Sequence, residues 1–294
     1  MKPISIPIHA VPEGTRHEED DLQYPEMPRG MATFSMPHVP EDADTSAMAE
    51  AAQLLQTFLD ALDCWNFKAR GTGPQLDLRG QPAEVLRVLN EVLGEGEVSA
   101  RVEGLPGGSV SVQESVFTGV WRVREFDAEN KETAYRIEAS SLPAILLDAA
   151  LQGAQPELPE VAFPEGAMNA PALFAEIRAQ LASFGTNGTT NGASHEINLT
   201  LFPLTPADHQ ALQEALPVGP VAIISKSFGS CRVTSTGTRH VWRIQHFNSK
   251  SALILNTLTI VERPLPILAA AEDIEDTRGR LAELISWMRA DAGM

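Results

Sequence analysis

The apolar positions in the first half of the chain follow helical spacing twice and then strand spacing four times. Over 48–65 and again over 85–93, apolar residues recur at three- and four-residue steps, which is typical of helices that pack on a core through one face. Apolar residues then alternate with polar ones in four short runs, the pattern of half-buried strands. These runs are 98–102, 110–116, 120–124 and 133–139. A short closing helix is expected over 142–151, and the short connections predict an antiparallel meander with helices on one face and the other face free.

The second half of the chain repeats this order. The stretch 119–127 recurs at 240–248, with Val, Trp, Arg and Phe in register. Both copies lead through a second apolar strand into a Leu-Pro pair, at 142–143 and 265–266. A fixed order of matched features indicates a tandem duplication. The other elements expected in this half are a helix over 173–184, a strand over 197–201, a helix opened by a capping box at Thr205–Asp208, strands over 221–225, 231–234, around Trp242 and over 253–261, and a last helix over 281–288.

The length and the repeat together predict two domains of ordinary size. The fold class that we expect is α+β, with two tandem related domains, each a mainly antiparallel β-sheet with helices packed on one face. The predicted boundaries are a proline-rich acidic arm over 1–45, a first repeat over 46–152, a linker over 153–169 and a second repeat over 170–294.

The arm combines prolines and acidic residues with a few large apolar side chains. Prolines at this density exclude a helix or an inner strand, and the acidic stretch 18–21 is expected to be solvated. Tyr24, Met27, Met31 and Phe34 are apolar side chains on an extended backbone, which can lie along a groove. They either dock on the protein's own surface or form part of a partner-binding surface.

Charge and hydropathy narrow the class of partner. With 39 acidic and 22 basic residues, the net charge is −17, which argues against a nucleic-acid partner because phosphate backbones are bound largely by Lys and Arg. The same charge would attract a basic partner or simply keep the protein in solution. No run of about 18 apolar residues exists, so we expect no direct insertion into a membrane. The first residues lack the apolar segment of a signal peptide, which predicts a cytoplasmic location.

Catalytic and metal-binding motifs are missing from the sequence. No dinucleotide-binding glycine pattern, no phosphate-binding loop with its lysine and no zinc-protease motif is present, and the seven histidines are scattered. Cys64 and Cys231 lie far apart and fit no metal-ligand spacing, so we expect two thiols buried in separate cores. Cys231 with His240 or His246 would be the residue types of a nucleophilic site, but one cysteine and a few histidines are expected by chance in a chain of this length. We therefore predict that the protein is not an enzyme and has no cofactor.

The two Trp-Arg strands are the remaining candidates for a site. Trp121 and Trp242 are expected to anchor the core. Arg122 and Arg124 lie on the opposite face of their strand, and Arg243 on the opposite face of the second copy. On an open sheet face these arginines, beside valines, predict a docking surface in each half.

Several motifs resemble those of the hydrogenase expression/formation proteins of the HupH/HyaF type. The span 102–123 is the most specific, and the resemblance covers nearly the whole chain. The matching segments are Tyr-x-x-Met-Pro at 24–28, Gly-Met at 30–31, Val-Glu-Gly-Leu-Pro-Gly at 102–107, Ser-Val-x-Glu-Ser-Val-Phe-x-Gly-Val-Trp-Arg-Val at 111–123, Leu-Pro-Ile-Leu-Ala-Ala-Ala-Glu-Asp-Ile at 265–274 and Leu-x-x-Leu-Ile-x-Trp-Met at 281–288.

The resemblance implies a chaperone that matures a membrane-bound uptake [NiFe] hydrogenase. Its expected partners are the precursor of the iron–sulfur small subunit, held before twin-arginine export, and other hydrogenase accessory proteins. The alternative is a redox or metal-handling accessory protein that protects or delivers an iron–sulfur centre through Cys64 or Cys231. An enzyme with a site between the halves is a third possibility.

Overall fold

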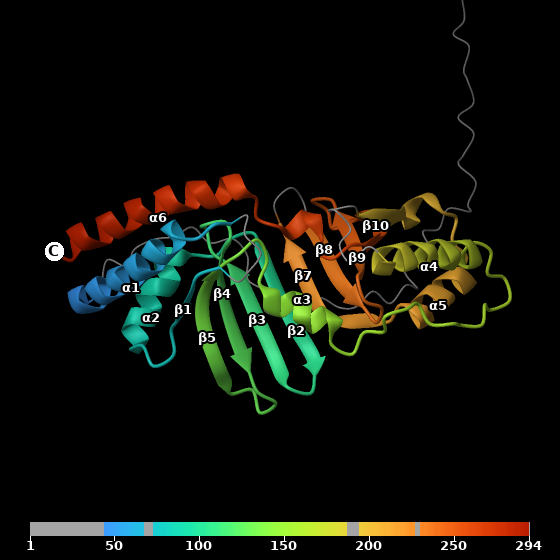
Figure 1. The fold of residues 1–294 in the computed structure, drawn as a ribbon, viewed down its shortest axis with the longest axis horizontal. Helices are drawn as coiled ribbons and strands as arrows, with labels where there is room; N and C mark the ends of the chain where they lie inside the picture. Colours follow the sequence, from blue (N-terminus) through green and yellow to red (C-terminus); the bar gives the residue numbers. More distant parts are fainter. Residues whose placement is uncertain (1–43, 68–72, 187–193, 227–229, 294) are drawn as a thin grey trace, which may run out of the picture.

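A computed structural model of the chain describes residues 44–67, 73–186, 194–226 and 230–293. Its centre is one ten-stranded sheet in which all neighbouring strands run antiparallel, in the order β1-β5-β4-β3-β2-β7-β8-β9-β10-β6 (Figure 1). The elements of the first half are α1 (Thr45–Asp63), β1 (Gln75–Asp77), α2 (Ala83–Leu93), β2 (Val98–Leu105), β3 (Gly108–Glu114), β4 (Val120–Phe126), β5 (Glu132–Ala139) and α3 (Ala144–Leu151). Those of the second half are α4 (Ala170–Thr186), β6 (His195–Asn198), η2 (Leu199–Leu201), α5 (Pro206–Ala215), β7 (Val218–Ser225), β8 (Ser230–Thr236), β9 (Val241–Phe247), β10 (Leu253–Ile260), η3 (Leu265–Ile267) and α6 (Ala271–Asp291).

The predicted α+β class and the tandem organisation are confirmed, and the meander β2–β5 lies where the alternation placed it. The predicted strand over 197–201 is too long. It ends at Asn198, whose side chain accepts a hydrogen bond from the Thr200 N–H and turns the chain into the short 3-10 helix η2. The capping box of α5 is confirmed, because Thr205 and Asp208 exchange side-chain and backbone hydrogen bonds.

The repeat is visible in matched hairpins. In the β4–β5 turn, the carboxylate of Asp127 accepts backbone hydrogen bonds from Glu129 and Lys131. In the β9–β10 turn, Asn248 does the same for residues 250 and 252. Both turns also contain one non-glycine residue with positive φ, 60° at residue 130 and 61° at residue 251. The two hairpins are therefore built by the same local interactions, as a duplication predicts.

The two halves share a single sheet. β2 pairs with β7 over five residues, from Val98 opposite Ser225 to Val102 opposite Val221. The order of strands on one side of this seam mirrors the order on the other, so the halves are related by an approximate twofold axis through it. Each half thus supplies half of one sheet. β2 and β7, which would be edge strands if the halves were separate, pair with each other.

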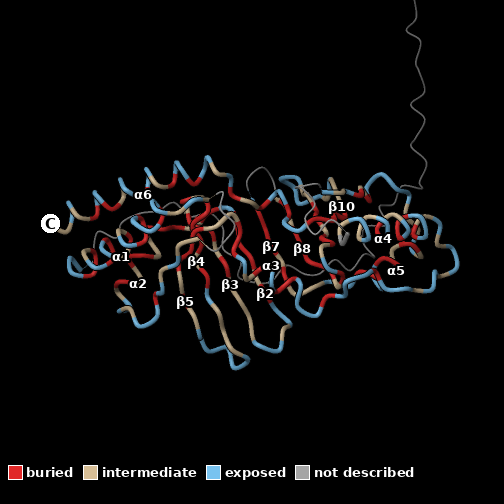
Figure 2. The backbone as a smooth tube through the Cα atoms, in the orientation of Figure 1, coloured by how far each residue is buried: buried red, intermediate tan, exposed pale blue. Residues whose placement is uncertain are grey.

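Helices cover both ends of one sheet face. At one end α1, α2 and α6 pack on residues such as Val120 and Ile137, and at the other end α4 and α5 pack on Val241 and Leu258 (Figures 1 and 2). The expectation that the opposite face is free was wrong. In the middle of that face, α3 and residues of η3 close a third apolar core, which contains Trp121 and residues from β2, β3, β4, β7, β8 and β9.

Helix α6 belongs to the second half in sequence but packs on the first. Its buried residue Leu281 lies in the same core as α1 and α2. The guanidinium of Arg278 donates to the carbonyls of Leu62 and Trp65, at 2.9 and 2.8 Å, where α1 ends. Thr277 donates to the carbonyl of Thr118. No helix in the described ranges combines the length and the apolar character needed to cross a bilayer.

Candidate partner-binding site

Five arginines lie on the helix-bearing face of the sheet in two adjacent register rows, which we call the arginine rows. Side chains paired across neighbouring antiparallel strands share a face, so the rows can be followed from strand to strand. The first row is Tyr135, Arg124, Ser111, Arg101, Ala222, Thr234, Arg243 and Leu258. The second row is Ile137, Arg122, Gln113, Ser99, Ile224, Arg232, Gln245 and Asn256. None of these positions is acidic, in a chain with 39 acidic residues.

Arg122 is held by helix α2. Its guanidinium donates to the side-chain oxygen of Asn90 at 2.8 Å and to the carbonyl of Gly94 at 2.9 Å, and its side chain is only 12% exposed. The Tyr135 hydroxyl donates to the same Asn90 oxygen, and burial raises the pKa of Tyr135, so the phenol remains a donor. The expectation that Arg122 faces outward was wrong, because α2 covers that part of the sheet.

Arg124 and Arg101 are the accessible members of the rows. Arg124 is 50% exposed, pairs with Glu132 at 2.5 Å and lies over the ring of Tyr135. Arg101 is 32% exposed and pairs with Glu103 at 3.4 Å. Both ion pairs are with acidic residues outside the rows.

Arg243, the counterpart of Arg122, is half-buried between its register partners Thr234 and Leu258. The sheet thus brings Arg122, Arg124 and Arg243 onto one continuous face, whereas the sequence predicted a separate surface in each half. It also adds Arg101 and Arg232, which we did not predict. Ser99 and Arg101 lie two residues apart on β2, so they share the face opposite Val98, Ala100 and Val102. The alternation of apolar residues over 98–102 therefore already indicated the face on which Arg101 lies.

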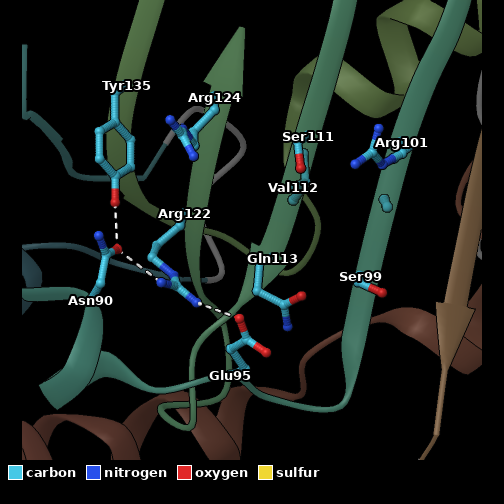
Figure 3. Close-up of a pocket in the computed structure, with 11 residues that line it drawn as sticks. Asn90, Glu95, Ser99, Arg101, Ser111, Val112, Gln113, Arg122, Arg124 and Tyr135 are labelled. Atoms are coloured by element: carbon cyan, nitrogen blue, oxygen red, sulfur yellow. Dashed lines mark hydrogen bonds and ion pairs between the residues drawn. The ribbon is translucent and has the colours of Figure 1, made fainter. Parts of the chain in front are cut away.

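A cavity of about 290 Å³ opens over the first half of the rows (Figure 3). It lies between the end of α2 and the strands β2 to β5. In Figure 3, Arg101 and Arg124 flank Ser111, while Arg122 lies between Asn90 and Glu95 and is joined to both by dashed lines. Glu95 neutralises Arg122 in part, so the donors that suit an anionic group from solvent are those around Arg101, Ser111 and Arg124.

The other predicted site residues fall into two groups. Trp121 and Trp242 are confirmed as core anchors, with 0% and 3% of their surface exposed. The arm residues lie outside the described part of the chain. They are Tyr24, Met27, Met31 and Phe34.

The two cysteines differ in their surroundings. Cys64 is exposed at the end of α1, so the expectation that both thiols are buried was wrong for Cys64. Cys231 is buried, and burial raises the pKa of its thiol to about 11. Its sulfur lies 3.9 Å from Nε2 of His246. Within the described ranges, no group of three or more His, Cys, Asp or Glu side chains is arranged to hold a metal ion.

Three buried carboxylates in the described residues were not predicted from the sequence: Glu114, Asp208 and Glu138, of which Glu138 pairs with Arg136 at 2.9 Å. Glu114 accepts a hydrogen bond from the Gly119 N–H, and burial raises its pKa to about 7. Glu114 lies on the same face of its strand as Val110 and Val112. An acidic residue at an apolar position of the alternation is therefore the sequence feature that could have predicted a buried carboxylate. Asp208 accepts backbone N–H groups from residues 168, 169 and 170, at the start of α4, in addition to its role in α5. The contact with α4 has no local sequence signal.

Comparison with known proteins identifies the class. A profile of the HupH hydrogenase expression protein, C-terminal conserved region, matches residues 48–157 and 167–288. The chain therefore belongs to the HupH hydrogenase expression protein family, as the motifs predicted.

Individual relatives cover almost the whole chain. The hydrogenase expression/formation protein HoxQ of Cupriavidus necator is 38% identical over 98% of this chain and 99% of its own. The hydrogenase expression/formation protein HupH of Rhodobacter capsulatus is 37% identical over 98% of both chains. The hydrogenase-1 operon protein HyaF of Escherichia coli is 32% identical over 72% of this chain and 73% of its own.

Proposed function

We propose that the protein is a non-catalytic maturation chaperone of a [NiFe] hydrogenase. It holds the precursor of the iron–sulfur small subunit in the cytoplasm before twin-arginine export, and it works alongside other hydrogenase accessory proteins. Family membership over nearly the whole chain supports a role in hydrogenase formation.

The arginine rows and their cavity are the observation that carries the proposal. They form a polar, donor-rich face on a rigid sheet, and a rigid face suits repeated capture and release of a protein client. Arg124 and Arg243 contact the client in this proposal, Arg122 positions the end of α2, and the apolar side chains of the arm supply further contacts. The net charge of −17 supports attraction of a basic signal peptide over longer distances.

Affinity capture tests the proposal directly. The tagged full-length chain is recovered from cells that contain the hydrogenase genes, grown with and without oxygen, and its partners are identified by mass spectrometry. We expect the small-subunit precursor with its signal peptide still attached. Absence of the precursor under both conditions, while the hydrogenase is expressed, would contradict the proposal.

A second candidate rests on the proximity of Cys231 to His246. A thiol and an imidazole 3.9 Å apart are two potential ligands for a metal-handling accessory protein. Burial, which raises the pKa of Cys231 to about 11, opposes this role because metals bind the thiolate. Cys64→Ser and Cys231→Ser variants separate the candidates. A chaperone keeps client capture in both variants, whereas an iron–sulfur carrier purified without oxygen contains iron that one of the variants loses.

A further inference from the structure

We propose that the open part of the arginine rows, around Arg101 and Arg124, binds carboxylate side chains of an extended acidic segment of the client. The inference deepens the proposed function, on which it rests for the identity of the client. The binding chemistry follows from four features of this face: its charge, the spacing of its arginines, the weak ion pairs that the exposed arginines now make, and its length.

Charge separates this face from the rest of the molecule. The rows contain five arginines and no acid, although acidic residues outnumber basic ones in the chain by 39 to 22. All five cations are Arg and none is Lys. The planar guanidinium donates two parallel hydrogen bonds to a carboxylate, which a lysine ammonium does not.

The spacing of the two accessible arginines fits an extended peptide. Arg124 and Arg101 lie two strands apart with Ser111 between them, and neighbouring strands are separated by about 4.8 Å. Their backbones are therefore about 10 Å apart. In an extended segment, side chains on the same side repeat every two residues, or about 7 Å. Flexible arginines at this separation reach two such carboxylates, and the Ser111 hydroxyl between them is available to the backbone of the segment.

The present partners of these arginines leave room for a ligand. Arg124 and Arg101 pair with Glu132 and Glu103, and such pairs at an exposed surface contribute little net stability, so a ligand carboxylate exchanges with them readily. Arg122 is fixed by its bonds to α2 and by an ion pair with Glu95 at 3.9 Å, and its Nε is buried, so the carboxylates of the segment contact Arg124 and Arg101 rather than Arg122.

The length of the rows favours a polypeptide over a small anion. Arg232 and Arg243 continue the rows on β8 and β9. The row positions beside these two arginines are buried, because Ile224, Thr234 and Gln245 are 5% exposed or less, so the accessible length is the distance of about 10 Å from Arg124 to Arg101. One small oxyanion does not span that distance, whereas two carboxylates of a single extended segment do.

Synthetic peptides test this inference without the client. A labelled octapeptide of alternating Glu and Ser, and a matched peptide of Gln and Ser, are titrated into the full-length protein at about 50 mM salt, where surface attraction is only partly screened. We expect saturable binding of the Glu peptide, no detectable binding of the Gln peptide, and loss of about tenfold in affinity in an Arg101→Gln/Arg124→Gln variant. Arg79→Gln is the matched control, because Arg79 is an exposed arginine paired with an acid outside the rows.

Three results would overturn the inference. They are equal binding of the Glu and Gln peptides, unchanged affinity in a double variant that melts like the wild type, and displacement of the peptide by inorganic phosphate at equal concentration. The last result would assign the cavity to small oxyanions. If the Glu peptide binds as expected but affinity capture recovers no hydrogenase precursor, the proposed function fails while this site stands.

Discussion

Trp121 and Trp242 make the same hydrogen bond, each to a carbonyl 19 residues further along the chain. The indole N–H of Trp121 donates to Ser140 at 2.9 Å, and that of Trp242 donates to Val261 at 3.2 Å. Both rings lie in one apolar core that draws residues from both halves. The duplicated tryptophans therefore hold the halves together, in addition to anchoring each half.

Replacing either tryptophan should destabilise the whole protein. In Trp121→Phe and Trp242→Phe the buried carbonyl loses its donor and a small cavity remains, so we expect the free energy of unfolding to fall by about 1–3 kcal/mol in each variant. Denaturant titration measures this change. Trp287→Phe is the control, because Trp287 is exposed on α6 and its replacement should change stability by less than about 0.5 kcal/mol. Equal stability of all three variants would contradict the role of the indole bonds.

Glu114 should make the protein less stable as the pH rises. Burial raises its pKa from 4.5 to about 7, so between these values the folded state holds a proton that the unfolded state has released. Stability contributed by the protonated form is present below pH 4.5 and is lost as the pH rises through 7. The loss is about 3–4 kcal/mol, since one pKa unit corresponds to about 1.4 kcal/mol.

A glutamine variant isolates this effect. In Glu114→Gln the amide oxygen still accepts from Gly119, and no proton is released. We expect the variant to gain stability relative to the wild type as the pH rises from about 5 to 8. Denaturant titration at each pH measures this gain. Glu129→Gln, at an exposed turn position, should keep a constant difference from the wild type. A constant difference for Glu114→Gln as well would refute the raised pKa.

Asp208 should fix the relative position of α4 and α5. Burial raises the pKa of this carboxylate, but hydrogen bonds from Thr205 and from residues 168–170 outweigh burial, and the net result is a lowered pKa. Its stabilising effect is therefore present above the pKa of the unfolded chain and is lost as the pH falls through the lower folded value. Asp208→Asn should cost about 2–4 kcal/mol at neutral pH, because several N–H groups lose a charged acceptor.

The cost of Asp208→Asn should shrink in acid, where the wild-type carboxylate is itself protonated. Thermal unfolding at neutral and acid pH measures both values. Asp276→Asn serves as the comparison, because Asp276 lies on an exposed helix face. A cost that does not depend on pH would mean that Asp208 acts through its shape alone.

Gly119 should be required where α6 crosses the β3–β4 turn. Its φ is +80°, and a Cβ placed there would lie 2.0 Å from Cδ1 of Ile274 on α6. Gly153 has a similar φ of +77° and open space around it. Gly153→Ala should therefore show only the backbone penalty of about 1 kcal/mol, while Gly119→Ala should cost at least about 1 kcal/mol more. Equal melting temperatures for the two variants would show that α6 adjusts at no cost.

Local chemistry explains which parts of the fold the sequence predicts. The hairpins were predictable because turn residues and strand alternation act within a few positions. The seam between β2 and β7 joins residues more than 100 positions apart, and nothing in the sequence of either strand indicates which strand it pairs with. The apolar face of α6 likewise predicts that the helix packs on a core but does not specify the half on which it packs.

The arginine site shows the same limit. Strand alternation correctly placed Arg122 on the face opposite Trp121. It did not follow that this face is open, because α2 covers it and binds the guanidinium. Arg124, two residues further along the same face, lies beyond the helix and is exposed. The direction of a side chain was thus readable from the sequence, whereas its exposure depended on the packing of a distant element.

The position of α6 has a consequence for synthesis on the ribosome. α6 begins more than 200 residues after α1, on which it packs. At about 5–20 residues per second, the nascent chain carries the uncovered surface of α1 for about 10–40 s before α6 is made. The first half therefore does not complete its core as an independent unit during translation. Closure of that core is a late event that requires the second half to have been made.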